Sequence, residues 1–186
     1  MKIVLNGCYG GFSLSYEAMY LYLQAKNKEA FFYADIPVYD KNTGCLINRL
    51  YKRITLSEIN QYRQSSYIYC TTEDQGEVLD WFPKNIFSSS NLDRTDPLLI
   101  TIVEVMGTQA ASGPYAHLCI EELPAGTQYK IDNYDGMEEL ITKDDNDWKT
   151  AEFQYQSMQT QLRVESIWHL IKPETTSDPD LMFKAQ

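Results

Sequence analysis

The order of apolar and polar positions predicts alternating strands and helices along the chain. KIVLN (2–6) is a short apolar run, typical of a buried strand. An amphipathic helix is expected up to about residue 27, with Ser13 or Ser15 as its N-cap; its apolar stripe holds Leu14, Ala18, Leu21 and Ala25. AFFYAD (30–35) predicts a second strand. A strand–helix–strand start favours a parallel pair with a right-handed crossover, and we expect strand 2–6 to lie inside its sheet.

The next part of the chain predicts an exposed strand, a short helix and another strand. PVYDKNTG has turn chemistry, and LINRLYKRIT (46–55) follows it as a strand. Arg49, Tyr51 and Arg53 alternate, so they share one face of that strand. Residues 56–63 predict a short helix, residues 66–72 a strand, and EDQGEVLDWFPKN a packed flap.

The helix signals are strongest at NLDRTDPLLITIVEVMG. Thr95 or Asp96 is expected to cap the helix, Pro97 lies in its first turn, and Gly107 ends it. Two strands are expected next, at 116–123 and 127–134, joined by a tight Pro-Ala-Gly turn.

The C-terminal third predicts a short helix at 137–143 and a long helix at about 147–171. In the long helix Trp148, Tyr155 and Leu162 lie on one apolar stripe, which we expect to pack on the core or on a second copy of the chain. The polar, proline-containing stretch after residue 173 predicts a loose tail.

Together these elements predict a single-domain α/β fold: a mixed sheet with a β-α-β start, flanking helices and a long C-terminal helix. We expect a core over residues 1–145, a helical extension over 146–172 and a flexible tail over 173–186. The length of 186 residues fits one domain with its own hydrophobic core.

Charge is distributed unevenly over the chain, whose net charge is −10. Residues 1–70 hold eight Lys and Arg against five Asp and Glu, whereas residues 121–152 hold three against ten. Direct nucleic-acid binding is therefore not expected, because repulsion from the phosphates would dominate. An anion site in the first third fits this charge pattern, and so does an acidic stretch that imitates a nucleic acid.

The composition argues for a cytoplasmic protein without a metal or cofactor. Cys8, Cys45, Cys70 and Cys119 are scattered and contain no C-x-x-C pair, which is typical of reduced thiols. With two histidines in the chain and no clustered cysteines, we expect no transition-metal centre. No membrane span or signal peptide is expected, since no apolar run approaches the required length. The 14 tyrosines supply flat surfaces with a polar tip, which suit either the core or a binding surface.

The main candidate site is the loop GCYGGFSLS between the first strand and the first helix. Backbone amides of a glycine-rich loop at a helix N-terminus can bind an anion, although neither the P-loop lysine nor G-x-G-x-x-G is present. Gly10-Gly11 as a plain turn is the competing interpretation. The predicted ligand-binding residues are Asn6, Cys8, Tyr9, Gly10, Gly11, Phe12, Ser13, Arg94 and Asp96. Arg94 would grip a phosphate or carboxylate or else form a salt bridge, and Asp96 would face the site or cap the helix.

No catalytic residue is assigned from the sequence. Cys8 as a nucleophile needs a nearby base, and His117 and His169 are distant in sequence. Asp135 with Asp132 or Glu138 has the residue types of a carboxylate pair for glycosidic cleavage, but Asp135-Gly136 is also a turn signal.

Three blocks of the chain resemble a known family. MKIVLNGCYGGFSLS, DRTDPLLITIVEVMGTQAASGPYAHLCIEELP and YKIDNYDGMEEL are similar to a family of small proteins widespread in tailed bacteriophages and prophages. The resemblance covers roughly residues 1–143. It implies phage origin and action inside an infected bacterium, and it supplies no reaction.

Three classes of function fit these observations. The first is a non-enzymatic protein that sequesters a small anionic, nucleotide-like ligand, such as a host defence signal, with tyrosine stacking and charge from Arg49, Arg53 or Arg94. The second is an acidic protein inhibitor or nucleic-acid mimic acting through residues 121–152. The third is a small enzyme acting on a nucleotide or a sugar.

Overall fold

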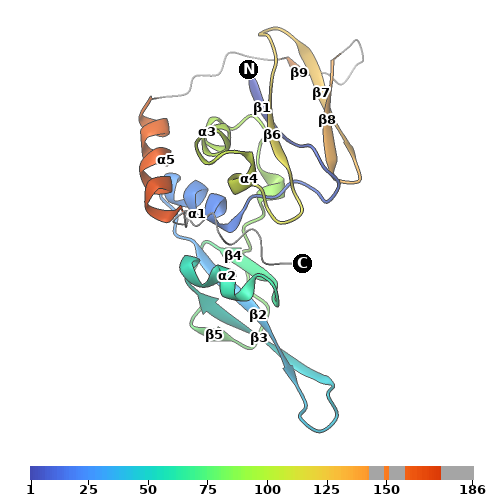
Figure 1. The fold of residues 1–186 in the computed structure, drawn as a ribbon, viewed down its shortest axis with the longest axis vertical. Helices are drawn as coiled ribbons and strands as arrows, with labels where there is room; N and C mark the ends of the chain where they lie inside the picture. Colours follow the sequence, from blue (N-terminus) through green and yellow to red (C-terminus); the bar gives the residue numbers. More distant parts are fainter. Residues whose placement is uncertain (143–148, 151–157, 173–186) are drawn as a thin grey trace, which may run out of the picture.

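The computed structural model describes residues 1–142, 149–150 and 158–172, and it has the expected α/β character (Figure 1). Helices and antiparallel sheets form one domain that ends in a C-terminal helix. Figure 1 shows a larger helical part that carries β1, β6, β7, β8 and β9, and a smaller sheet from which one long hairpin projects.

The helical part is built around two capped helices that the sequence predicts. In α1 (Tyr16–Ala25), Ser15 is the N-cap and its side chain accepts a hydrogen bond from the Ala18 amide. In α3 (Pro97–Met106), Asp96 is the N-cap, proline occupies the first position, and Gly107 ends the helix with φ 80°. The short α4 (Thr108–Ala111) follows directly. Both predicted helix starts are confirmed.

The first strand lies at a sheet edge, so its predicted interior position is wrong. β1 (Lys2–Asn6) pairs antiparallel with β6 (Leu118–Glu122) in a two-stranded sheet. The order β1–α1–β2 is as expected, but β2 (Phe31–Tyr39) belongs to another sheet, and the strand pairs of the described residues are all antiparallel. β1 is nevertheless buried, because α3 and the hairpin after β6 cover it. Burial by helices and side chains thus replaces the expected neighbouring strand.

The predicted short helix at 137–143 is a strand instead. β7 (Gln128–Tyr134) and β8 (Met137–Ile141) form a hairpin, and the two-residue strand β9 (Lys149–Thr150) pairs with the other edge of β7. Asp135 and Gly136, at the turn, have φ 51° and 87°, as a tight two-residue hairpin requires. The long helix was expected to start at about residue 147, which is wrong, because Lys149 and Thr150 form a strand.

The smaller sheet has the strand order β4-β2-β3-β5, from β3 (Leu46–Ile54), β4 (Ile68–Thr71) and β5 (Val78–Leu79) together with β2. A 3-10 turn, η1 (Leu56–Glu58), and α2 (Ile59–Tyr62) match the predicted short helix. A second 3-10 turn, η2 (Ser89–Asn91), precedes α3. The far halves of β2 and β3 run beyond β4 and β5 and form the projecting hairpin of Figure 1.

The C-terminal helix α5 (Met158–Ile171) packs on α1 and α3. Val164 is fully buried, and Ile167, Trp168 and Ile171 pack against the same core cluster. Leu162 is 57% exposed, so its predicted burial is wrong: the buried stripe is rotated by part of a turn. Trp148, Tyr155 and the predicted tail at 173–186 lie outside the described residues. No helix among the described residues is long and apolar enough to cross a membrane.

Candidate functional site

The loop GCYGGFSLS is packed against two other loops of the same chain. Gly10 adopts φ 130°, and a Cβ there would collide with the backbone at Tyr115. The turn at Gly136 lies equally close, since a Cβ on Gly136 would come within 2.7 Å of the Gly11 Cα atom. The glycines of both loops therefore allow backbones to approach one another. This contact gives the loop a structural role that does not depend on a ligand.

Asn6, at the end of β1, is fully buried and joins three segments. Its Nδ2 atom donates to the carbonyls of Cys8 and Gly136, each at 2.7 Å, and its Oδ1 accepts from the His117 amide at 2.8 Å. The Asn6 side chain is thus satisfied within the protein.

Arg94 forms an ion pair with Glu138. From the sequence alone, Glu138 is one of several carboxylates without an assigned partner. Arg94 Nη2 donates to Glu138 Oε1 at 2.8 Å, and both side chains are largely buried, with 13% and 5% exposed. The same guanidinium donates to the carbonyls of Ser90 and Leu92. It also lies over the Phe12 ring at 3.5 Å. The salt bridge, one of the two interpretations given above, accounts for Arg94 in this structure.

Asp96 acts as a helix cap and as the acceptor for two other side chains. Its Oδ1 accepts from the Leu98 amide at 2.8 Å, and its Oδ2 accepts from the Tyr22 hydroxyl at 2.7 Å. Lys26 Nζ lies 3.3 Å from the same oxygen. Burial, followed by the hydrogen bond to Asp96, raises the pKa of Tyr22 above its ordinary value, so its hydroxyl stays a donor.

The other predicted loop residues do not converge on one cavity. Tyr9 is 61% exposed and contacts Tyr134 edge to face, whereas Phe12 is buried under Arg94. The Ser13 carbonyl accepts from the Gly113 amide. Cys8 Sγ lies 3.5 Å from Asn6 Oδ1 and from the Tyr115 carbonyl. Ligand binding by these residues stays a prediction, and the contacts just described hold them in place without a ligand.

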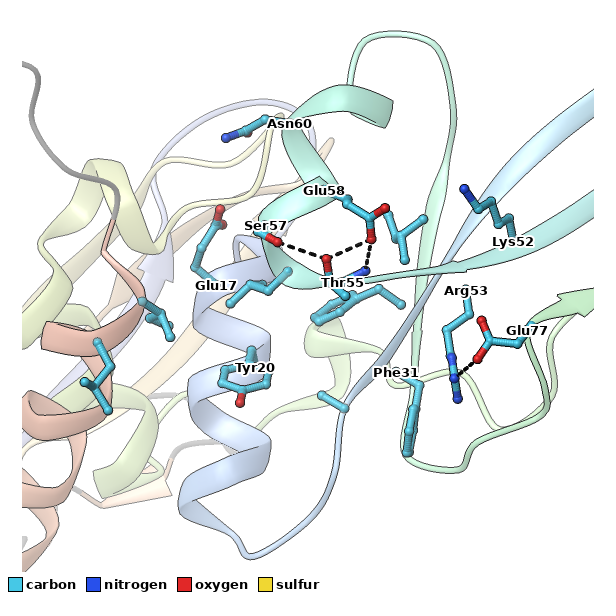
Figure 2. A pocket seen from close by; sticks show the side chains of 16 residues that line it. Glu17, Tyr20, Phe31, Lys52, Arg53, Thr55, Ser57, Glu58, Asn60 and Glu77 are labelled. Atoms are coloured by element: carbon cyan, nitrogen blue, oxygen red, sulfur yellow. Dashed lines mark hydrogen bonds and ion pairs between the residues drawn. The ribbon is translucent and has the colours of Figure 1, made fainter.

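A large groove lies elsewhere, between α1, α5, η1 and the smaller sheet (Figure 2). Its volume is about 1150 Å³. Aromatic and aliphatic side chains from separate elements line it, including Tyr20, Phe31, Leu56, Leu170 and Ile171. Of the cations considered from the sequence, Arg53 reaches this groove. The sequence offers no signal for the groove as a whole, because its lining comes from segments far apart in the chain.

The carboxylates of the groove are already paired with neighbouring groups. Glu17 lies 3.5 Å from Arg63, Glu77 pairs with Arg53, and Glu58 accepts from the amide and hydroxyl of Thr55. The Thr55 hydrogen bonds lower the pKa of Glu58, so it stays ionised.

Lys52 also lines the groove. Among the described residues, no carboxylate forms a direct ion pair with Lys52. Its Nζ donates to the Tyr62 hydroxyl at 3.1 Å, and this bond raises the pKa of Lys52 above its ordinary value. Lys52 is exposed and stays charged at neutral pH. The groove therefore combines an apolar, partly aromatic lining with the exposed positive charge of Lys52 and the ionised carboxylate of Glu58.

The acidic stretch considered from the sequence lies partly on β6, β7 and β8. Its exposed carboxylates among the described residues are Glu121, Glu122, Asp132, Asp135 and Glu139. Asp132 and Glu139 are cross-strand partners in the hairpin. Glu138 alternates to the inner side of β8 and binds Arg94, so a catalytic pair with Asp135 would first have to break that ion pair.

Burial affects two of the four cysteine thiols. Burial raises the pKa of the Cys70 thiol to about 12, and burial also raises the pKa of Cys119. Within the part of the chain that the structure describes, no three His, Cys, Asp or Glu residues gather as metal ligands would. No family model matches the chain, and neither a curated protein nor a solved structure is similar to it.

Proposed function

We propose that this chain is a non-enzymatic binding protein that takes up a small nucleotide-like ligand in the groove between α1, α5 and the smaller sheet. The observation that carries the proposal is the groove of about 1150 Å³ with aromatic lining and the positive charge of Lys52. This volume is slightly above the range of about 300–1,000 Å³ that is usual for small-molecule pockets, so the groove has room for a ligand of that size.

The chemistry of the lining favours a flat, amphipathic ligand with a negative charge. Tyr20 and Phe31 offer rings on which a base can stack, and Figure 2 shows them on different elements of the groove. Lys52 would bind a phosphate as a point charge. The side chains of Thr55, Ser57 and Asn60 add polar partners for a sugar or for the edge of a base.

Sequestration is favoured over turnover because the hydrogen-bonded hydroxyl and carboxylate in the groove, Thr55 and Glu58, form the capping box of η1 and not a free nucleophile with its base. His and Cys are absent from the lining given by the described residues. The carboxylates there are tied to Arg53, Arg63 or Thr55. Given the resemblance to phage proteins, the ligand we propose is a signalling nucleotide made by the infected host.

The proposal is tested by thermal shift with a panel of linear and cyclic nucleotides. We expect some of them to raise the melting temperature, since a ligand that binds only the folded state stabilises it by mass action. Lys52→Ala should lose the shift, and Asn60→Trp, which places a bulky ring in the groove, should lose it too. Lys28→Ala is the matched control, because Lys28 is an exposed lysine away from the lining. A panel without any shift, or one that shifts all variants equally, would contradict the proposal.

A further inference from the structure

The hairpin β7–β8 turns one face to the core and the other to solvent. Ile131 and Leu140, on the inner face, pack against the core cluster that holds side chains of β1. Successive residues of a strand point to opposite faces, so Asp132 and its cross-strand partner Glu139 lie on the outer face, as does Tyr134. These last three side chains are exposed. The outer face is therefore accessible to a partner.

Three exposed tyrosines lie together at the turn of this hairpin. The exposed fractions are 61% for Tyr9, 73% for Tyr115 and 73% for Tyr134. The rings of Tyr9 and Tyr134 meet edge to face, with 6.5 Å between their centroids. Tyr115 lies against the same loop as Tyr9, because a Cβ on Gly10 would collide with the Tyr115 backbone. We call these three residues and the exposed carboxylates of the hairpin the tyrosine patch: Tyr9, Tyr115, Tyr134, Asp132, Asp135 and Glu139.

Folding alone does not account for the tyrosine patch. Rings that are exposed to this degree add little to the hydrophobic core. Asp132 and Glu139 lie directly opposite each other, and like charges in this position destabilise a hairpin. Within the described ranges no ion pair neutralises Asp132, Asp135 or Glu139. An interaction site accounts for both features, since tyrosine is enriched at interfaces and a bound cation relieves the repulsion.

The charge at this end of the molecule favours a positively charged partner. Residues 113–142 contain six Asp and Glu, of which only Glu138 is buried, and one lysine or arginine, Lys130. Lys130 lies on the outer face as well, but on the far side of Asp132 from the turn. The surface near the turn therefore repels nucleic acids, anionic membranes and a second copy of itself, and it attracts a basic protein surface.

The tyrosines favour arginine or lysine side chains as the bound cations. A guanidinium can stack on a tyrosine ring while it donates to a neighbouring carboxylate, and an ammonium can make the same two contacts. Tyr134 and Asp135 are adjacent in sequence, and the Asp135 carbonyl accepts from the Gly10 amide beside Tyr9. Rings and carboxylates are thus presented together on one surface.

We propose that the tyrosine patch is the docking surface for a basic segment of a partner protein, whose arginine or lysine side chains bind the tyrosine rings and the carboxylates together. This surface is separate from the small-ligand groove. None of the six residues of the patch lines the groove, and Figure 1 shows β7 and β8 at the end of the molecule opposite the projecting hairpin of the smaller sheet.

The test begins with selection of peptides from a random displayed library on the immobilised full-length chain. We expect the selected sequences to be rich in arginine or lysine. A selected peptide is then measured by fluorescence anisotropy against a version with citrulline for arginine and acetyl-lysine for lysine, which removes the charge. This version should bind at least about tenfold more weakly. Selection of peptides without basic residues would overturn the proposal.

Tyrosine variants locate the peptide on the chain. Tyr9→Ala combined with Tyr134→Ala should weaken binding by about tenfold, because two rings of the patch are lost. Both side chains are exposed, so the variant should fold. Tyr39→Ala is the control, since Tyr39 is 56% exposed on the projecting hairpin, and it should bind like the wild type. Equal binding by the double variant and the control would overturn the proposal.

Charge variants separate docking at the patch from general attraction to an acidic protein. Asp132→Asn combined with Glu139→Gln should weaken the peptide by about tenfold. Glu29→Gln combined with Asp80→Asn changes the net charge by the same amount at exposed positions outside the patch, and should have little effect. Equal losses in the two double variants would contradict a specific site.

Two further measurements exclude other occupants. Asn60→Trp, which fills the groove, should leave peptide binding unchanged, and a loss of binding would place the peptide in the groove instead. Light scattering of the chain alone should give the same mass for the wild type and for Tyr9→Ala with Tyr134→Ala. A lower mass for the variant would show that a second copy occupies the patch, and would overturn the proposal.

Discussion

Arg94 and Glu138 form a buried ion pair that ties the start of α3 to the hairpin β7–β8. The Nε and Nη2 atoms of Arg94 both donate to the Glu138 carboxylate, at distances of 2.8–3.2 Å. Glu138 Oε2 also accepts from the Asn6 amide at 3.0 Å, which brings β1 into the same network. The side chains of Arg94 and Glu138 thus connect three segments that are far apart in the sequence: β1, the start of α3 and the hairpin β7–β8.

Arg94→Ala should therefore destabilise the fold, by about 3–5 kcal/mol, because it leaves the Glu138 carboxylate buried without its partner. The measurement is chemical denaturation followed by circular dichroism. Replacing both residues by apolar ones, as in Arg94→Met with Glu138→Leu, should recover part of this loss: no charge stays buried, but the Asn6 amide loses its acceptor. If Arg94→Ala were as stable as the wild type, the pair would not hold these segments together.

The backbone contact between Gly136 and Gly11 gives a second prediction. Gly126→Ala places a residue at φ 88° with open space around its Cβ, and should cost about 1–2 kcal/mol through backbone strain alone. Gly136→Ala has nearly the same φ, 87°, but its Cβ collides with the Gly11 backbone. Overpacking of this kind adds about 1–3 kcal/mol. Equal unfolding free energies of the two variants would show that the loops are not in contact.

The orientation of α5 is tested by two substitutions on opposite sides of the helix. Val164 is fully buried and Leu162 is 57% exposed. Val164→Ala should lower the unfolding free energy by about 1–3 kcal/mol, whereas Leu162→Ala should change it by less than about 0.5 kcal/mol. A larger loss of unfolding free energy for Leu162→Ala than for Val164→Ala would instead support the stripe predicted from the sequence, in which Leu162 faces inward.

Cys45 and Cys70 should differ in reactivity with a thiol reagent. Cys45 is exposed at the tip of the projecting hairpin, whereas burial raises the pKa of Cys70 to about 12. Cys45 should react rapidly at pH 8, and Cys70 should react only at the rate of unfolding. Fast labelling of both thiols in the folded protein, read by peptide mass spectrometry, would contradict the burial of Cys70.

The same shift in the pKa of Cys70 makes stability depend on pH. The folded protein keeps this proton up to a higher pH than the unfolded chain, whose thiol has the ordinary value of 9.0. The unfolded state therefore binds fewer protons above pH 9, and stability should fall as pH rises from about 9 toward 12. Cys70→Ala should lack this contribution, which a comparison of denaturation midpoints over that pH range would show.

The sequence predicts local structure well where the signals are chemical and lie within one segment. Ser15, Asp96 and Gly107 mark helix ends by their own side chains or conformations, and the structure confirms all three. The alternation of Arg49, Tyr51 and Arg53 on one face of β3 follows from strand geometry and is also confirmed. In contrast, Asp135-Gly136 was a visible turn signal, but a turn alone does not say whether the chain after it continues as a helix or as a strand.

Features that depend on contacts between distant segments could not be predicted from the sequence in this way. Nothing in KIVLN indicates that β1 pairs with β6 instead of a parallel neighbour. The partner of Arg94 is a glutamate 44 residues away. The lining of the groove runs from Glu17 to Ile171, so no single stretch of sequence carries its signal.

The most direct test of the proposed function is equilibrium dialysis of the protein against a nucleotide extract of bacterial cells, followed by mass spectrometry of the released ligand. The account predicts that the wild type and Lys28→Ala retain a nucleotide-like compound, which is recovered chemically unchanged. Asn60→Trp and Lys52→Ala, folded at the same temperature, should retain little or none of it. Release of a chemically altered compound would indicate an enzyme instead. Retention by Asn60→Trp equal to that of the wild type, or no retention by the wild type, would contradict binding in the groove.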